Sequence, residues 1–228
     1  MARFNSATLL GKVVNEKLEP KIIGKHQTDG IKPNAVLNFL IEYFDEEDKR
    51  TYRLPVAVWG VDEVEQCEEH MKKGDLVLVQ GEVRYKHIPL RDEYGKIQRD
   101  ENDEIIMEKI FTTLKTNTIE FVSKKLKNEA LQYGINDVKL IGNLVSEPTD
   151  SEEGFVVAVD RLYPTKEVKP NENLADFITL VATDKAKIQG GLKKGSTVIV
   201  DGKMMTRKRR KDIVTPNIVI GIKEMVGR

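Results

Sequence analysis

Residues 72–81 read KKGDLVLVQG, and residues 193–202 read KKGSTVIVDG. In both segments a cationic pair and a glycine, typical of a helix end, precede an alternating run rich in β-branched residues, typical of a strand. A glycine, Gly81 or Gly202, lies inside or just after each strand, where a bulge or a tight bend is expected. The pair therefore predicts one structural unit that occurs twice in the chain.

Four further blocks repeat in the same order, which supports an internal duplication. Each is short, apolar and rich in β-branched residues, so each predicts a strand. The blocks are 5–11 and 136–142, 39–41 and 155–157, 54–58 and 177–181, and 116–122 and 215–222. The sequence therefore predicts five strands in each copy.

A short helix is expected between the third and fourth strands, at Val61 to Met71 in the first copy and at Ala186 to Leu192 in the second. Five strands with a helix in this place are the plan of the OB-fold, a partly open barrel. The predicted fold class is mainly all-β, with two tandem five-stranded OB-fold barrels. We expect a first domain at 1–123, a linker at 124–134 and a second domain at 135–228.

The first copy also has an insert at 86–110 that the second copy lacks. A turn signal, Glu93-Tyr94-Gly95, lies between apolar and β-branched residues, so the insert is expected to be a protruding hairpin. Its acidic run, Asp100 to Glu104, is poorly suited to contact phosphate.

The charges are unevenly distributed, although the formal net charge is +0. Residues 1–124 hold 19 Lys and Arg against 23 Asp and Glu, and the remainder holds 18 against 14. Five consecutive cations, Arg207 to Lys211, lie in the second half. Any electrostatic footprint on a nucleic acid is therefore expected to be local and stronger in the second copy.

Composition and motifs argue against an enzyme, a membrane protein and an exported protein. No apolar run is long enough to cross a bilayer, and the start MARFNSATLL lacks a signal peptide's apolar stretch. Cys67 is the only cysteine, and the three histidines lack metal-ligand spacing. We expect a cytoplasmic protein without cofactor, metal or catalytic residues. The enzyme alternative is a metal-dependent nuclease, and the scattered histidines argue against it.

The ordered blocks resemble those of bacterial single-stranded-DNA-binding proteins of the OB type. The resemblance lies in INDVKLIGNLVSEP, in VAVWG with the later KKGDLVLVQGEVR, and in KKGSTVIVDGKMMTRKRR. It covers most of both halves apart from the linker and the insert. The resemblance implies sequence-nonspecific binding of single-stranded DNA in replication, recombination or repair. Aromatic rings would stack on bases, and Lys and Arg would contact phosphates.

Carrying the family's stacking positions across selects Trp59, with Ala182 at the equivalent place in the second copy. One further family aromatic aligns with Arg53, next to Tyr52. Another matches Tyr163, with Tyr43 or Phe44 in the first copy. The predicted nucleic-acid-binding residues are Trp59, Tyr43, Tyr52, Arg53, Arg84, Tyr85, Lys86, Tyr163, Arg207, Lys208, Arg209, Arg210 and Lys211. The alternative role of each aromatic is to pack in the core or at the barrel rim. The alternative interpretation of the cationic run is a solvated hairpin.

The alternative function is a protein-interaction or assembly module of a replication or recombination complex, because OB barrels serve many functions. The incomplete stacking set and the acidic first half favour this alternative. Family members that work with four barrels would need two such chains, so a homodimer is expected. The acidic C-terminal tail by which the family recruits protein partners is not found after the last predicted strand.

Overall fold

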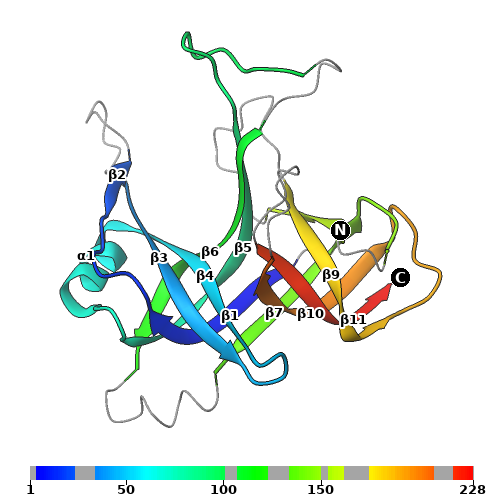
Figure 1. Cartoon of the computed structure of the whole chain (residues 1–228), viewed down its shortest axis with the longest axis horizontal. Helices are drawn as coiled ribbons and strands as arrows, with labels where there is room; N and C mark the ends of the chain where they lie inside the picture. Colours follow the sequence, from blue (N-terminus) through cyan, green and yellow to red (C-terminus); the bar gives the residue numbers. More distant parts are fainter. Residues whose placement is uncertain are drawn as a thin grey trace.

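The computed structural model describes residues 4–23, 34–100, 107–122, 134–149, 154–161, 175–207 and 218–227. Barrel 1 is built from β1 (Phe4–Val13), β2 (Lys21–Ile23), β3 (Asn34–Asp45), β4 (Arg50–Trp59), α1 (Val61–His70), β5 (Leu76–Pro89) and β6 (Met107–Phe121). Barrel 2 is built from β7 (Asn136–Leu144), β8 (Phe155–Asp160), β9 (Ala175–Ile188), β10 (Thr197–Thr206) and β11 (Ile218–Gly227). Figure 1 shows the two barrels side by side.

Both barrels close by the same ring of strand pairs. In barrel 1 the ring runs β1–β3–β4–β6–β5 and returns to β1. In barrel 2 it runs β7–β8–β9–β11–β10 and returns to β7. The β4–β6 pair of barrel 1 and the β9–β11 pair of barrel 2 are parallel, and the other pairs are antiparallel. This confirms the predicted all-β fold of two five-stranded OB barrels.

Alternation places the apolar side of every strand inside its barrel. Leu9, Leu54 and Val79 have 0% exposure in barrel 1, as do Leu140 and Ile178 in barrel 2. Burial of such side chains stabilises the fold by about 1.5–3 kcal/mol each. The core therefore fixes which side of each strand faces outward, and with it the residues that can contact a ligand.

Gly11 lets the first strand bend between two neighbours. At the corner where β1 leaves β5 for β3, a Cβ on Gly11 would lie 2.6 Å from the Glu42 carbonyl oxygen. Gly142 has the same role in barrel 2, where a Cβ would collide with the Ala158 carbonyl oxygen. Gly81 and Gly202 lie inside β5 and β10, at β-bulges, as the sequence predicts.

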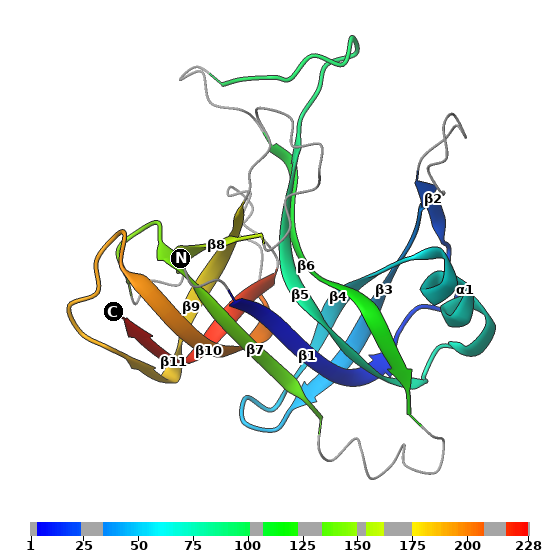
Figure 2. The same cartoon turned by 180° about the vertical axis from the view of Figure 1, so that it is seen from behind.

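The barrels are joined by an antiparallel ladder between β1 and β7, whose register runs from Phe4↔Ile141 to Leu9↔Asn136. In Figure 2 these two strands cross the middle of the molecule. The predicted linker falls outside the described residues except for Gly134, and the domain boundaries stay a prediction.

The insert extends β5 and β6 beyond barrel 1 as a two-stranded arm. The ladder continues from Val77↔Phe121 to Pro89↔Met107 (Figure 1). Beyond it, the predicted turn is present at Asp92 to Gly95, where Gly95 has φ 79°. Of the acidic run, only Asp100 lies among the described residues.

The helix prediction is right for the first copy and wrong for the second. In barrel 1, α1 buries Val64 and Cys67 and ends at His70. In barrel 2 no helix lies at Ala186 to Leu192, because β9 continues to Ile188 and pairs with β11 through Lys187↔Glu224. Ladder hydrogen bonds over this stretch outweigh a weak helical preference. Within the described part of the chain, no helix is long and apolar enough to span a bilayer.

Candidate nucleic-acid interface

The outward side of β3 and β4 carries the predicted contact residues that are exposed. The register pairs Trp59 with Val36, Arg53 with Glu42 and Thr51 with Phe44, so these side chains share one face. Figure 1 shows this face between β2 and the β5–β6 arm. We call it the outer face of barrel 1, and it continues onto β6 and β5 because Ala57 pairs with Lys115 and Lys115 with Glu82.

Trp59 has a cationic partner on this face. The Lys115 ammonium lies 4.9 Å from the centroid of the half-buried Trp59 ring. Burial lowers the pKa of Lys115, and repulsion from Arg84 and Arg161 lowers it further. The site thus combines an aromatic platform with a cation that lies close to other cations.

Arg53 and Phe44 lie farther along the same face. The Arg53 Nε is 3.3 Å from Glu42 Oε2, and both side chains are exposed enough for water to screen the pair. Phe44 is 51% exposed, which leaves its ring accessible to a base. A hollow lined by Glu42, Thr51, Arg53 and Thr206 connects this end to barrel 2.

The structure corrects the prediction that Tyr52 contacts a nucleic acid. Its ring is 2% exposed, and its hydroxyl donates to Asp48 Oδ2 at 2.7 Å. Burial and the neighbouring Asp48 raise the pKa of Tyr52 to about 12. A base cannot stack on this ring without opening the core, so Tyr52 is a core residue.

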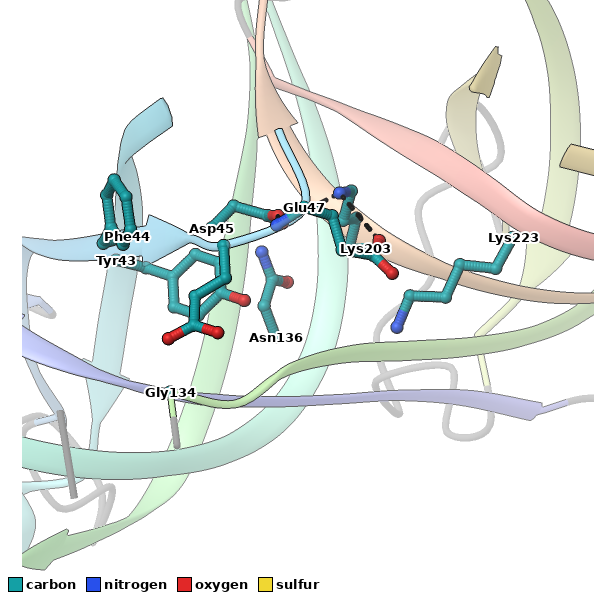
Figure 3. A pocket seen from close by; sticks show the side chains of 9 residues that line it. Tyr43, Phe44, Asp45, Glu47, Gly134, Asn136, Lys203 and Lys223 are labelled. Atoms are coloured by element: carbon teal, nitrogen blue, oxygen red, sulfur yellow. Dashed lines mark hydrogen bonds and ion pairs between the residues drawn. The ribbon is translucent and has the colours of Figure 1, made fainter. Parts of the chain in front are cut away.

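Tyr43 lies in a hollow between the barrels and not on the outer face. The hollow of about 180 Å³ is also lined by Asn136 and Lys203, as Figure 3 shows. Burial raises the pKa of Tyr43, as does the nearby Asp45. Of the alternatives Tyr43 and Phe44, only Phe44 therefore lies on the outer face of barrel 1.

The same region contains a buried ion pair between the barrels. Lys203 Nζ lies 2.8 Å from Asp45 Oδ2 (Figure 3). It also lies 2.9 Å from Asp48 Oδ2, and the Lys203 side chain is 4% exposed. Burial alone lowers the pKa of Lys203, but hydrogen bonds to Asp45 and Asp48 outweigh this and raise it. We call Lys203, Asp45 and Asp48 the closed junction.

A second ion pair connects the barrels at Arg84. Its Nη1 lies 2.7 Å from Asp176 Oδ2, and its Nη2 bonds to Glu82. From barrel 2, Arg161 Nη2 lies 3.2 Å from Asp176 Oδ1. We call Arg84, Asp176 and Arg161 the open junction, because Arg161 is 38% exposed.

The structure describes only some of the remaining predicted residues. The half-buried Tyr85 has its pKa raised by burial, and its backbone N–H donates to Asp176 Oδ1 at 3.0 Å. Arg207 ends the described part of its segment, next to Thr206 at the end of β10. The side chain of Lys86, together with Tyr163 and Lys208 to Lys211, lies outside the described residues.

The strand registers also correct the match between the two copies. Phe39 faces Val56 across β3 and β4, and Phe155 faces Leu180 across β8 and β9. Leu180 therefore corresponds to Val56, one residue later than the sequence match placed it. The counterpart of Trp59 is Thr183 and not Ala182.

With this register, Phe177 takes the place of Arg53. A shift of one residue exchanges inside for outside, and Phe177 lies on the outward side of β9, opposite Ala158. Each barrel thus holds one aromatic of the stacking set that the other lacks.

Sequence reasoning missed Lys115, Arg161 and Asp176. Lys115 is identified only by the parallel β4–β6 register, and Asp176 by a contact with Arg84 across 92 residues. A single cation in a strand and a single carboxylate at a strand start carry no local signal.

The chain was compared with known proteins. The sequence model of the Single-strand binding protein family matches residues 4–113. The wild-type single-stranded DNA binding protein from Thermus aquaticus matches with a TM-score of 0.61 and 16% identity over 100% of this chain and 94% of that chain. A deletion mutant of that Thermus aquaticus protein matches with a TM-score of 0.61 and 18% identity over 100% of this chain and 96% of that chain.

A comparison with curated protein sequences returned no match. At these identities, the structural likeness establishes the shared two-barrel fold. The family match covers most of barrel 1, including Trp59, and ends before Lys115. Residues 4–113 are thus similar to the Single-strand binding protein family, and barrel 2 repeats the same fold.

Proposed function

We propose that this chain binds single-stranded DNA without sequence preference on the outer face of barrel 1. Bases stack on Trp59 and Phe44, and phosphates contact Lys115 and Arg53. The observation that carries the proposal is the pairing of Trp59 with Lys115 on an outward strand face, at 4.9 Å. The processes served are those that expose single strands, namely replication, recombination and repair.

Energetics favour exchange of the Lys115 contact for a base. An exposed cation–π contact contributes about 0.5–1 kcal/mol, whereas a base stacked on an aromatic contributes about 1–3 kcal/mol. A nucleotide that stacks on Trp59 also brings a phosphate that the displaced ammonium can neutralise. DNA therefore gains the stacking energy and keeps the cation bound.

The test is a titration of the chain with oligo-dT while the fluorescence of Trp59, the only tryptophan, is followed. We expect quenching, and an affinity that falls steeply with salt because phosphate contacts release counterions. Trp59→Phe should keep most of the affinity, measured with a labelled oligonucleotide, and Trp59→Ala should lose it. Absence of quenching and of binding at low salt would contradict the proposal.

The chain also has a large apolar row on a different face. Phe4 pairs with Ile141, Ile141 with Ile199, and Ile199 with Val226, so all four side chains lie on one side of β1, β7, β10 and β11. Phe4, Ile199 and Val226 are 45%, 47% and 39% exposed. Contiguous exposed apolar surface of this kind marks an association site.

We assign this row to a second copy of the chain. The row spans both barrels, and a two-fold axis brings one patch against its own copy, which makes the contact self-complementary. A homodimer through this face would leave the outer face of barrel 1 accessible. The row is also the observation that favours the alternative function, a protein-interaction module.

Light scattering distinguishes these possibilities. The wild-type chain should be a dimer at micromolar concentration, and Ile199→Glu should be a monomer that still binds short oligo-dT. If the wild-type chain were a monomer, the proposed homodimer would be overturned. The apolar row would then be a candidate contact surface for a different protein.

The proposed activity is binding alone, without catalysis or a cofactor. The family description that matches residues 4–113 names binding. A reduced, buried Cys67 is compatible with action in the cytoplasm.

A further inference from the structure

The open junction joins the outer face of barrel 1 to barrel 2 through one carboxylate. Asp176 is 1% exposed and accepts hydrogen bonds from Arg84 of barrel 1 at 2.7 Å and from Arg161 of barrel 2 at 3.2 and 3.3 Å. The backbone N–H of Tyr85 donates a further bond at 3.0 Å. The positions of both guanidinium groups are thereby fixed relative to each other.

This carboxylate lies at the edge of the proposed DNA face. Arg84 pairs with Thr113 and Glu82 with Lys115, so Arg84 and Lys115 point to the same side of β5 and β6. Figure 1 shows β5 and β9 next to each other where the barrels meet. A strand that stacks on Trp59 and passes Lys115 therefore reaches Arg84 and then Arg161.

Among the described residues, the local charges are one anion short. Three cations, Arg84, Lys115 and Arg161, are accompanied by two carboxylates, Glu82 and Asp176. One phosphate at this place would balance the cluster.

Arg161 has donors to offer to such a phosphate. A guanidinium has five N–H donors, and the contact with Asp176 uses Nε and Nη2, leaving Nη1 outside it. With 38% of its side chain exposed, Arg161 is open to solvent on one side. Charge-assisted arginine–phosphate hydrogen bonds are among the strong ones.

We propose that the open junction is the place where one DNA strand crosses from barrel 1 to barrel 2. A phosphate binds between Lys115 and Arg161, and Asp176 is a positioning residue that holds Arg84 and Arg161 in place. This inference rests on the proposed DNA binding and adds a second part of the path. Strands too short to leave barrel 1 do not use Arg161.

The experiment compares two lengths of oligo-dT on the full chain. One of about 5 nucleotides is near the smallest site of an OB barrel, and one of about 30 nucleotides covers two barrels. Arg161→Gln should weaken binding of the long oligonucleotide about fivefold and reduce its salt slope by about 0.7, as for one lost phosphate contact. Binding of the short oligonucleotide should not change.

Lys185→Gln is the matched control. It removes one positive charge from β9 about 30 Å from Asp176 along the strand, at about 3.3 Å per residue, where the side chain is exposed. It should leave both affinities within about twofold of wild type, since a distant exposed charge is screened. If Lys185→Gln lowered the affinity for the long oligonucleotide as much as Arg161→Gln does, the effect of Arg161→Gln would come from net charge alone. That result would overturn the proposed crossing.

Asp176→Asn tests the positioning role, with circular dichroism as a check that the variant folds. The variant adds positive charge, so electrostatics alone predicts tighter binding of long strands. Positioning predicts that the advantage of the long over the short oligonucleotide falls. Tighter binding of the long strand would show that Asp176 merely competes with phosphate.

The outcomes separate the two proposals. If wild type binds neither oligonucleotide, the proposed function fails. If wild type binds both and Arg161→Gln keeps the full affinity for the long strand, only the crossing fails.

Discussion

The closed and open junctions hold the same two barrels together in opposite ways. Both place a cation of a fourth barrel strand against carboxylates of the other barrel. Lys203 follows the bulge glycine Gly202, and Arg84 lies three residues after the matching Gly81. The closed junction is buried at its centre, with Lys203 and Asp45 at 4% and 3% exposure, and Asp48 is 28% exposed. At the open junction, Arg84 and Arg161 are 21% and 38% exposed.

This difference in exposure distinguishes a structural contact from a surface that is open to a ligand. At the closed junction, Asp45 and Asp48 surround one ammonium, so the cation has its partners within the protein. At the open junction two arginines share Asp176, and Arg84 also pairs with Glu82, so the surplus cation nearby is Lys115. The closed junction is thus a structural contact, and the open junction is the one that we propose for binding.

The largest expected effect comes from breaking the closed junction. Lys203→Met leaves Asp45 and Asp48 without their cation, and loss of one partner of a buried pair costs about 3–5 kcal/mol. The free energy of unfolding, measured by urea denaturation, should fall by this amount. Adding Asp45→Asn to Lys203→Met should recover part of the loss; no recovery would contradict an unpaired carboxylate as the cause.

Breaking the open junction should cost less stability and more binding. Arg84→Met leaves Asp176 with Arg161 as its partner, so the free energy of unfolding should fall by only about 1–2 kcal/mol. Affinity for long oligo-dT should fall about tenfold, because the proposed crossing loses the positive charge of Arg84 and its hydrogen bond to Asp176. Titration and denaturation of the same sample measure both. A stability loss as large as that of Lys203→Met would remove the distinction between the junctions.

A pH titration tests the closed junction alone, through Tyr52 and its acceptor Asp48. The pKa of Tyr52 is raised from 10.0 to about 12 by burial first and then by Asp48. Because the unfolded chain ionises first, the stability that Tyr52 contributes is complete below pH 10 and is lost as the pH rises towards 12.

Tyr52→Phe should remove this part of the alkaline pH dependence. At neutral pH it should cost about 1 kcal/mol, for one hydrogen bond to Asp48. Denaturation midpoints at several pH values measure both effects, with Tyr94→Phe on the exposed arm as the control. An unchanged profile in Tyr52→Phe would show that another group titrates there.

The smallest change in the free energy of unfolding is expected for an ion pair outside both junctions. Lys139 Nζ lies 3.1 Å from Asp201 Oδ2, with side chains 52% and 42% exposed. Lys139→Met should lower the free energy of unfolding by less than about 1 kcal/mol, because exposed pairs contribute little. A loss equal to that of Lys203→Met would mean that burial does not set the order of these effects.

The sequence predicted those features that repeat or alternate. The duplicated blocks led to two barrels, and the family's stacking positions selected Trp59 and Arg53, which share one face of β4. Neighbouring Tyr52 points the other way, into the core. The error in matching Ala182 to Trp59 has the same origin, because a slip of one residue exchanges the faces of a strand.

The junctions are beyond local sequence reasoning. Lys203 and Asp45 are 158 residues apart, and Arg84 and Asp176 are 92 apart. No periodicity relates them, since each contact depends on how one barrel is placed against the other. The helix expected at Ala186 to Leu192 failed for a related reason: the β9–β11 ladder there depends on a partner strand far along the chain.

The β1–β7 ladder has a consequence for affinity. Six paired positions, from Phe4↔Ile141 to Leu9↔Asn136, fix barrel 2 beside barrel 1. Once barrel 1 holds a DNA strand, barrel 2 meets the next nucleotides at a high effective concentration, which in linked systems reaches the millimolar range. Even weak binding by barrel 2, which lacks the tryptophan, then lengthens the time for which the whole chain stays bound.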